Sequence, residues 1–188
     1  MTPRASASRR RFAHWLGRKG MTLPETLVVV GITVVIVALL VPILSRARAA
    51  SREVACIGNL RQLGMGFRFY AQDEGHLPYP AFTQVPWERS LVKYVSLPTF
   101  RCGSDAELGP VTGSSYDWRD TGVPETTLAG KEWREAQRAD TALAFEALPG
   151  WHQPGRINVT CVDGSSKVMG HDEFGAELDR PIAATAGR

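Results

Sequence analysis

The longest hydrophobic pattern in the chain is a run of 20 residues, 26–45, that contains no charged side chain. Val, Ile and Leu fill it on every side of a helical projection, so a helix here has no polar face to turn towards water. At about 1.5 Å per residue the run spans about 30 Å, the thickness of the hydrocarbon core of a bilayer. The pattern therefore predicts a membrane-spanning helix rather than a buried helix or strand.

Beyond this run the hydrophobic residues recur at steps of three and four, which indicates an amphipathic continuation of the same helix. The stripe consists of Ile57, Leu60, Leu63, Phe67 and Tyr70. Gly75 and Pro78 end the pattern, so we expect one helix from about residue 23 to 72, about 75 Å long. Pro42 removes a hydrogen bond inside it, which predicts a kink or a loosened turn there.

The remaining residues, 75–188, are expected to form a small head. Residues 86–95 suggest a short helix, and residues 142–145, 157–162 and 167–169 suggest strands. Asp163-Gly164 is a hairpin signal between the last two strands. Residues 103–140 are rich in Gly, Ser, Thr, Asp and Pro and are expected to be mostly loop, and residues 183–188 to fray. The predicted fold class is α+β, with a long N-terminal helix, half transmembrane and half amphipathic, packed on a small antiparallel sheet.

Charge is distributed unevenly along the 188 residues. Residues 1–20 hold six of the 22 basic residues and none of the 19 acidic ones, so the rest of the chain has 16 basic against 19 acidic residues. A slightly acidic body argues against a nucleic-acid-binding surface on the head. The positive-inside rule predicts a cytoplasmic N-terminus and places residues 46–188 on the other side of the membrane.

Two ordinary interpretations of the N-terminus remain open on the residues alone. One is a cleaved signal peptide, with Ala47-Arg48-Ala49 as its cleavage site and a twin-arginine-like stretch at residues 8–12. The apolar run is longer than the ~7–15 residues usual for such a signal. The other is an uncleaved anchor, in which Thr22 and Glu25 form a capping box and Pro24 occupies the first helical turn.

A third interpretation rests on a family resemblance. Lys19-Gly20-Met21-Thr22-Leu23-Pro24-Glu25, followed by an apolar helix, resembles the processing motif of type IV prepilins and type II secretion pseudopilins. The resemblance implies cleavage after Gly20, methylation of the new N-terminal Met21, and a role for Glu25 in assembly. It also matches Pro42 to a proline common in pilin helices. The implied organisation is a leader at 1–20, a transmembrane and stem helix at 21–74 and an extracytoplasmic head at 75–188.

Further elements of the stem helix and the head resemble a large bacterial group of prepilin-like proteins. They are Cys56–Gly64, Tyr70–Asp73, Leu77-Pro78, Phe100–Asp105 and Trp151–Gly164. The last element is similar to a His-(nine residues)-Asp-Gly ending, although ten residues intervene here. The resemblance touches residues from about 20 to 170.

The resemblance implies a structural subunit of a secretion pseudopilus or pilus-like filament, not an enzyme, and no cofactor. Its implied partners are other pilin or pseudopilin subunits, a prepilin peptidase, an inner-membrane assembly platform and the lipid bilayer. The implied location is the bacterial inner membrane, with the head in the periplasm. The alternative is a soluble hydrolase or binding module, secreted after cleavage behind Ala49.

Three cysteines are widely spaced, and without a C-x-x-C pair we expect no zinc site. Cys56 and Cys102 both lie outside the cytoplasm in the predicted topology, and we expect them to form a disulfide. Cys161 alternates with Ile157 and Val159, which indicates a small apolar core residue. Three buried free thiols are the alternative.

Other candidate chemistry has simpler interpretations. His152, Asp163 and Ser165 match the residue types of a hydrolase triad, but no nucleophile elbow or oxyanion loop accompanies them, so a turn aspartate and a strand-end histidine are expected. Asp163, Asp172 and Glu173 are weak candidates for calcium, because EF-hand spacing is absent. Trp87, Trp118, Trp133 and Trp151 are expected in the core or at subunit contacts.

Overall fold

The structure is a computed structural model that describes residues 21–79, 86–136 and 138–182. The predicted leader and the predicted frayed tail lie outside these ranges. The chain divides into two compact units, one ending at Ser45 and the other beginning at Arg46. The second is called the head unit below. Residues 46–74, predicted as part of the stem, therefore belong to the head unit.

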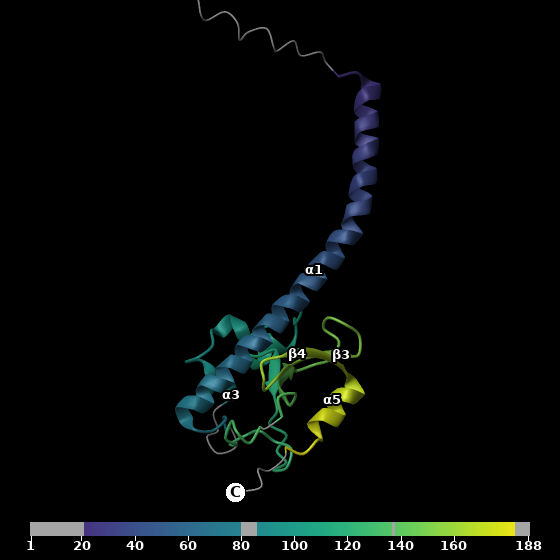
Figure 1. Cartoon of the computed structure of the whole chain (residues 1–188). Coiled ribbons are helices and arrows are strands. Elements are labelled where there is room, and N and C mark those ends of the chain that lie inside the picture. The colour runs from purple at the N-terminus through teal and green to yellow at the C-terminus, as the bar shows by residue number, and fades with distance from the viewer. Residues whose placement is uncertain (1–20, 80–85, 137, 183–188) are drawn as a thin grey trace, which may run out of the picture. The chain divides into compact units, whose positions relative to one another are not determined.

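Helix α1, Leu23–Glu74, contains 52 residues and matches the single long helix predicted from the hydrophobic pattern. Pro42 lies inside α1, so any loosening at this proline does not end the helix. The ribbon of α1 is unbroken in Figure 1. Gly75 adopts a φ of 83°, and its amide donates to the carbonyl of Ala71. Glycine enters this left-handed region without a steric penalty, which explains why the helix ends here.

The part of α1 before Arg46 exposes its apolar side chains. Leu23 is 74% exposed, and even the most covered large aliphatic residues of this part, such as Val37, are 51% exposed. The hydroxyl groups of Thr26 and Thr33 donate to Leu23 and Val29 carbonyls of the same helix, so they need no water. Among the described residues, α1 is the one helix long and apolar enough to cross a membrane. This confirms the predicted long apolar helix, and its crossing of a membrane stays a prediction.

The head unit contains a four-stranded antiparallel sheet in the order β1-β2-β3-β4. The strands are β1 (Tyr116–Trp118), β2 (Ala142–Glu146), β3 (Arg156–Cys161) and β4 (Ser166–Gly170). The last three correspond to the three predicted strands, and the predicted hairpin turn lies between β3 and β4. The α+β fold class is confirmed at this level.

The two central strands are covered on both faces, which explains why all of β2 is buried. The amphipathic part of α1 packs with Leu143 and Ala144 in one cluster, together with Phe67, Trp87 and Trp118. The opposite cluster contains Ala142 and Phe145 of β2, and it includes Phe174 of α5 (His171–Leu178). An irregularity in the register between Ala142 and Ala144 accounts for this break in the usual alternation of faces.

Several short elements differ from the prediction or were not predicted. Helix α3, Trp87–Leu91, is shorter than expected and is followed by a 3₁₀ turn, η1, at Leu97–Phe100. The region predicted to be loop contains helix α4, Leu108–Thr112, and strand β1. Asp105 explains α4, because its carboxylate accepts hydrogen bonds from the amides of residues 107, 108 and 109. Three-residue β1 is held by pairing with β2, which a local pattern does not reveal.

Candidate functional site

Glu25 lies at the start of α1 and binds the residue that precedes the helix. Its Oε2 atom accepts a hydrogen bond from the amide of Thr22 at 2.7 Å and one from the Thr22 hydroxyl at 2.8 Å. This is the carboxylate half of the predicted capping box. Glu25 and Met21 are both exposed, and Gly20 lies outside the described residues. In a single chain, the carboxylate of Glu25 is therefore accessible to a neighbouring molecule.

The second candidate site is buried in the head unit around two cysteines. Cys56 of α1 and Cys102, which follows η1, are joined by a disulfide with a Cα–Cα distance of 5.3 Å. Cys161 is a free, buried thiol on β3, as its alternation with Ile157 and Val159 predicted. The bond attaches the amphipathic part of α1 to the segment that leads into the loops of the head unit.

His152 and Glu146 lie against this disulfide. The Nε2 atom of His152 is 3.3 Å from the sulfur of Cys102 and 3.2 Å from Oε1 of Glu146. The side chain of His152 is 4% exposed and that of Glu146 is 1% exposed. Glu146 ends β2, whereas His152 comes from the loop that leads to β3, so the β2–β3 connection brings them together.

Two polar residues, Asn158 and Ser104, lie within hydrogen-bond distance of this pair. Asn158 of β3 donates to both carboxylate oxygens of Glu146, from its backbone amide at 3.1 Å and its side-chain nitrogen at 3.0 Å. Burial raises the pKa of the Glu146 carboxyl, and the Asn158 hydrogen bonds and nearby His152 oppose this rise. The Nδ1 atom of His152 is 3.4 Å from the hydroxyl of Ser104. Both side chains are thus fixed in orientation.

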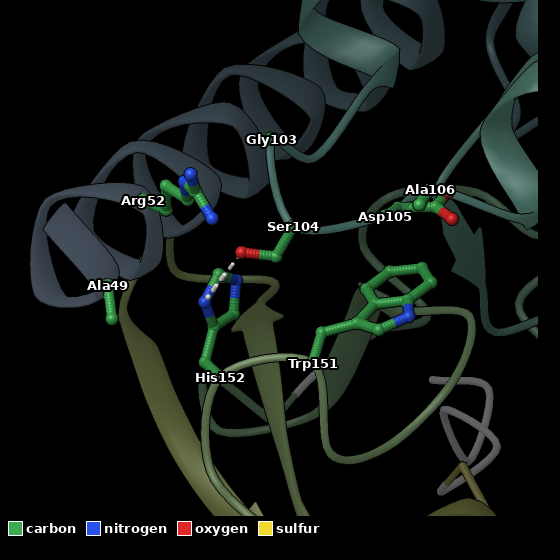
Figure 2. A pocket seen from close by; sticks show the side chains of 8 residues that line it. All are labelled: Ala49, Arg52, Gly103, Ser104, Asp105, Ala106, Trp151 and His152. Atoms are coloured by element: carbon green, nitrogen blue, oxygen red, sulfur yellow. Dashed lines mark hydrogen bonds between the residues drawn. The ribbon is translucent and has the colours of Figure 1, made fainter. Parts of the chain in front are cut away.

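A surface pocket of about 320 Å³ opens beside His152. In Figure 2, Ser104 and His152 point towards one another across it, with Arg52 of α1 on one side and Trp151 on the other. The remaining lining comes from Ala49 and residues 103, 105 and 106. The pocket gives the edge of the buried cluster access to solvent.

We call Cys56, Cys102, Glu146 and His152 the Cys-Glu-His cluster. Each residue contributes one donor atom, and these four atoms lie within 4.8 Å of one another. Sequence reasoning missed the cluster because its members come from four separate segments. Three of them stand in segments singled out for their resemblance to prepilin-like proteins, whereas nothing marked Glu146.

The predicted calcium candidates do not come together. Asp163 lies in the turn at one end of the β3–β4 hairpin, where it accepts a hydrogen bond from the Ser165 amide. Asp172 and Glu173 begin α5 at the opposite end, beyond the Arg156–Gly170 pair. Five residues of β4 separate the ends by about 17 Å. These carboxylates therefore do not share one ion.

The same hairpin separates the residues of the hypothetical hydrolase triad. His152 precedes β3, whereas Asp163 and Ser165 follow it. Asp163 is a turn residue, as expected, but His152 is buried beside Glu146 rather than a plain strand-end residue. Trp87 and Trp118 are buried in the core, and Trp133 and Trp151 pack partly buried against it, in line with their prediction as core or contact residues.

Comparisons with known proteins provide no further assignment. No protein-family model matches the chain, and searches of curated proteins and of solved structures found no match either. The functional argument therefore rests on the residues and geometry described above.

Proposed function

We propose that the chain is a prepilin-like structural subunit of a type II secretion pseudopilus or a type IV pilus-like filament. It is cleaved after Gly20 and methylated at Met21, and its helix then anchors it in the bacterial inner membrane. The head unit lies on the periplasmic side. The work of the protein is mechanical, through polymerisation with other subunits, rather than enzymatic. A prepilin peptidase and an inner-membrane assembly platform are its proposed processing and assembly partners.

The observation that carries this proposal is the difference between the two parts of α1, one exposed and apolar and the other packed into the head unit. Before Arg46 the helix is apolar on all sides and covered by nothing in the described chain. After Arg46 the same helix contributes Cys56, Leu60, Leu63 and Phe67 to the core of the head unit. A helix of this kind gives a subunit an apolar stem for contacts with lipid or other stems, and a folded head attached to it.

The secreted alternative requires cleavage behind Ala49. Residues 47–49 lie inside α1, where the backbone is helical. Proteolytic cleavage prefers exposed loops and termini, because there the chain can adopt an extended conformation. The described residues that follow Gly20, Met21 and Thr22, lie outside the helix, which begins at Leu23. This favours Gly20 over Ala49 as the processing site.

Replacing Gly20 with Val tests the proposed processing. Valine resists many backbone conformations that glycine permits, so the peptidase should fail at the altered site. We expect a full-length Gly20→Val precursor in the membrane, unassembled, when the protein is followed by immunoblotting in a host with a prepilin peptidase. Gly17→Val is the matched control and should be processed normally. A Gly20→Val chain still shortened by about 20 residues would contradict the proposal.

A further inference from the structure

We propose that the Cys-Glu-His cluster binds one zinc ion when Cys56 and Cys102 are reduced. The head unit would then be cross-linked here in one of two ways, by a disulfide in the oxidised chain or by a metal ion in the reduced chain. This inference concerns the head unit alone and does not depend on the proposed filament.

The spacing of the donor atoms matches a tetrahedral zinc site. Zinc lies about 2.3 Å from thiolate sulfur and about 2.0–2.2 Å from imidazole nitrogen or carboxylate oxygen, so its ligands lie about 3.3–3.8 Å apart. His152 Nε2 is 3.3 Å from Cys102 Sγ and 3.2 Å from Glu146 Oε1, close to these separations. All four donors already lie within 4.8 Å of one another. Reduction needs to move the two sulfurs apart only to about 3.8 Å.

Ser104 and Asn158 make contacts to His152 and Glu146 of the kind that orient metal ligands. A metal-bound histidine usually uses its second nitrogen in a hydrogen bond that fixes its tautomer and ring orientation, and a bound carboxylate is itself hydrogen-bonded. His152 presents Nε2 to the cluster and Nδ1 to Ser104, as Figure 2 shows for the latter pair. Glu146 is held by two hydrogen bonds from Asn158. A disulfide alone requires none of these contacts.

The donor set selects the ion. Calcium and magnesium prefer oxygen ligands, whereas two thiolates with an imidazole and a carboxylate suit zinc. Two thiolates and the Glu146 carboxylate carry three negative charges, and Zn²⁺ neutralises two of them inside the protein. The pocket beside His152 provides the entry route.

The disulfide and the dithiol that precedes zinc binding differ by two electrons and two protons. A dithiol reductant transfers both to the Cys56–Cys102 bond; the bond breaks, two thiols form, and the reductant becomes a disulfide. Zinc then replaces the two thiol protons, which are released to solvent. Oxidation of the thiolates by a disulfide-bonded oxidant reverses the exchange and expels the ion.

The test uses the purified full-length chain in detergent, reduced without oxygen and freed of reductant. After addition of zinc and desalting, elemental analysis should find one zinc per reduced chain and none per oxidised chain. Cobalt(II) added in place of zinc should give thiolate charge-transfer absorption and the intense ligand-field bands of a tetrahedral site. X-ray absorption of the zinc form should count two sulfur and two nitrogen or oxygen neighbours. Absence of metal from the reduced wild-type chain would overturn the proposal without any variant.

Variants assign the ligands. Cys102→Ser and His152→Ala should lose stoichiometric zinc, whereas Cys161→Ser, which removes the other cysteine, should retain it. Ser104→Ala should weaken zinc binding by about tenfold, because it frees the His152 ring. Full zinc binding by Cys102→Ser, or its loss in Cys161→Ser with native circular dichroism, would place the metal elsewhere and overturn the assignment.

Discussion

Glu25 has a defined role in the single chain and a different proposed role in a filament. In the single chain its carboxylate caps α1 through Thr22. In a filament the stems would pack together and desolvate this end of the helix, where an unpaired charge is strongly unfavourable. The proposed cleavage after Gly20 would create an ammonium group on Met21, four residues away in sequence. That group on a neighbouring subunit is the proposed partner of Glu25.

Glu25→Gln separates the two roles, because glutamine still caps a helix but carries no charge. We expect the variant to be inserted, cleaved and stable in the membrane, yet defective in assembly when subunits are cross-linked and filaments are sheared off and quantified. Glu25→Asp is the control that keeps the charge and should recover part of the assembly. Filament formation by Glu25→Gln at the native rate would show that Glu25 is a helix cap only.

Arg119 is a buried charged residue of the head unit, with a side chain that is 1% exposed. Its guanidinium donates to Glu177 at 3.1 Å and to the carbonyl groups of residues 126, 178 and 180. Burial lowers the pKa of Arg119, although Glu177 opposes that shift. This one side chain therefore connects the end of β1 to the end of α5.

Arg119→Leu should destabilise the head unit by about 3–5 kcal/mol, because it leaves Glu177 buried with less compensation. The measurement is urea unfolding of the full-length chain in detergent, followed by tryptophan fluorescence. Arg138→Leu is the matched control: Arg138 pairs with Asp140 on the surface, where an ion pair contributes little. Equal unfolding midpoints for the two variants would show that the buried network is not important for stability.

At the scale of elements, Gly66 is the glycine of α1 at which an added side chain would clash with the rest of the head unit. A Cβ atom added there would overlap Cγ2 of Val95 and lie 3.9 Å from Leu91 of α3. Both of these side chains are buried. The absence of a side chain at position 66 therefore sets how near α1 lies to the segment that follows α3.

Gly66→Ala should destabilise the head unit by about 1–3 kcal/mol through overpacking, despite the better helix propensity of alanine. Gly58→Ala lies in the same helix, where an added Cβ meets nothing within 4 Å. That control should stabilise the chain by about 0.5–1 kcal/mol. Urea midpoints that rise for both variants would contradict the packing at Gly66.

The success of sequence reasoning differed between elements for physical reasons. Helix α1 was predicted almost to the residue because its apolar run, its three- and four-residue stripe and Gly75 are all local signals. Strand β1 has only three residues and depends on pairing with distant β2. Helix α5 was missed because Phe174 and Leu178 are too few apolar positions to show a period.

The two candidate sites show the same contrast. Glu25 was predicted from its place beside Thr22 and an uncharged run, and both features are contiguous in sequence. The pairing of Cys56 with Cys102 was also expected from the cysteine count and the predicted topology. Glu146 and His152 beside that pair were not, because the register of β2 and β3 determines their positions and no short motif encodes that register.

At the scale of the whole molecule, a single continuous α1 joins a segment long and apolar enough to cross a membrane to an α+β head unit. The proposed filament role depends on where the mature chain begins. Cleavage after Gly20 keeps all of α1, which gives the subunit both its anchor and its stem. Cleavage after Ala49 removes the apolar part and leaves a soluble head unit.

Mass spectrometry of the N-terminal peptide, from protein collected from both the membranes and the soluble fractions of its native host, distinguishes these outcomes most directly. The account predicts a peptide that begins with N-methylated Met21. A peptide beginning at Ala50 would indicate the secreted alternative, and an intact Met1 or Thr2 would indicate an uncleaved anchor. Either of these two results would contradict the proposed role as a processed prepilin-like subunit.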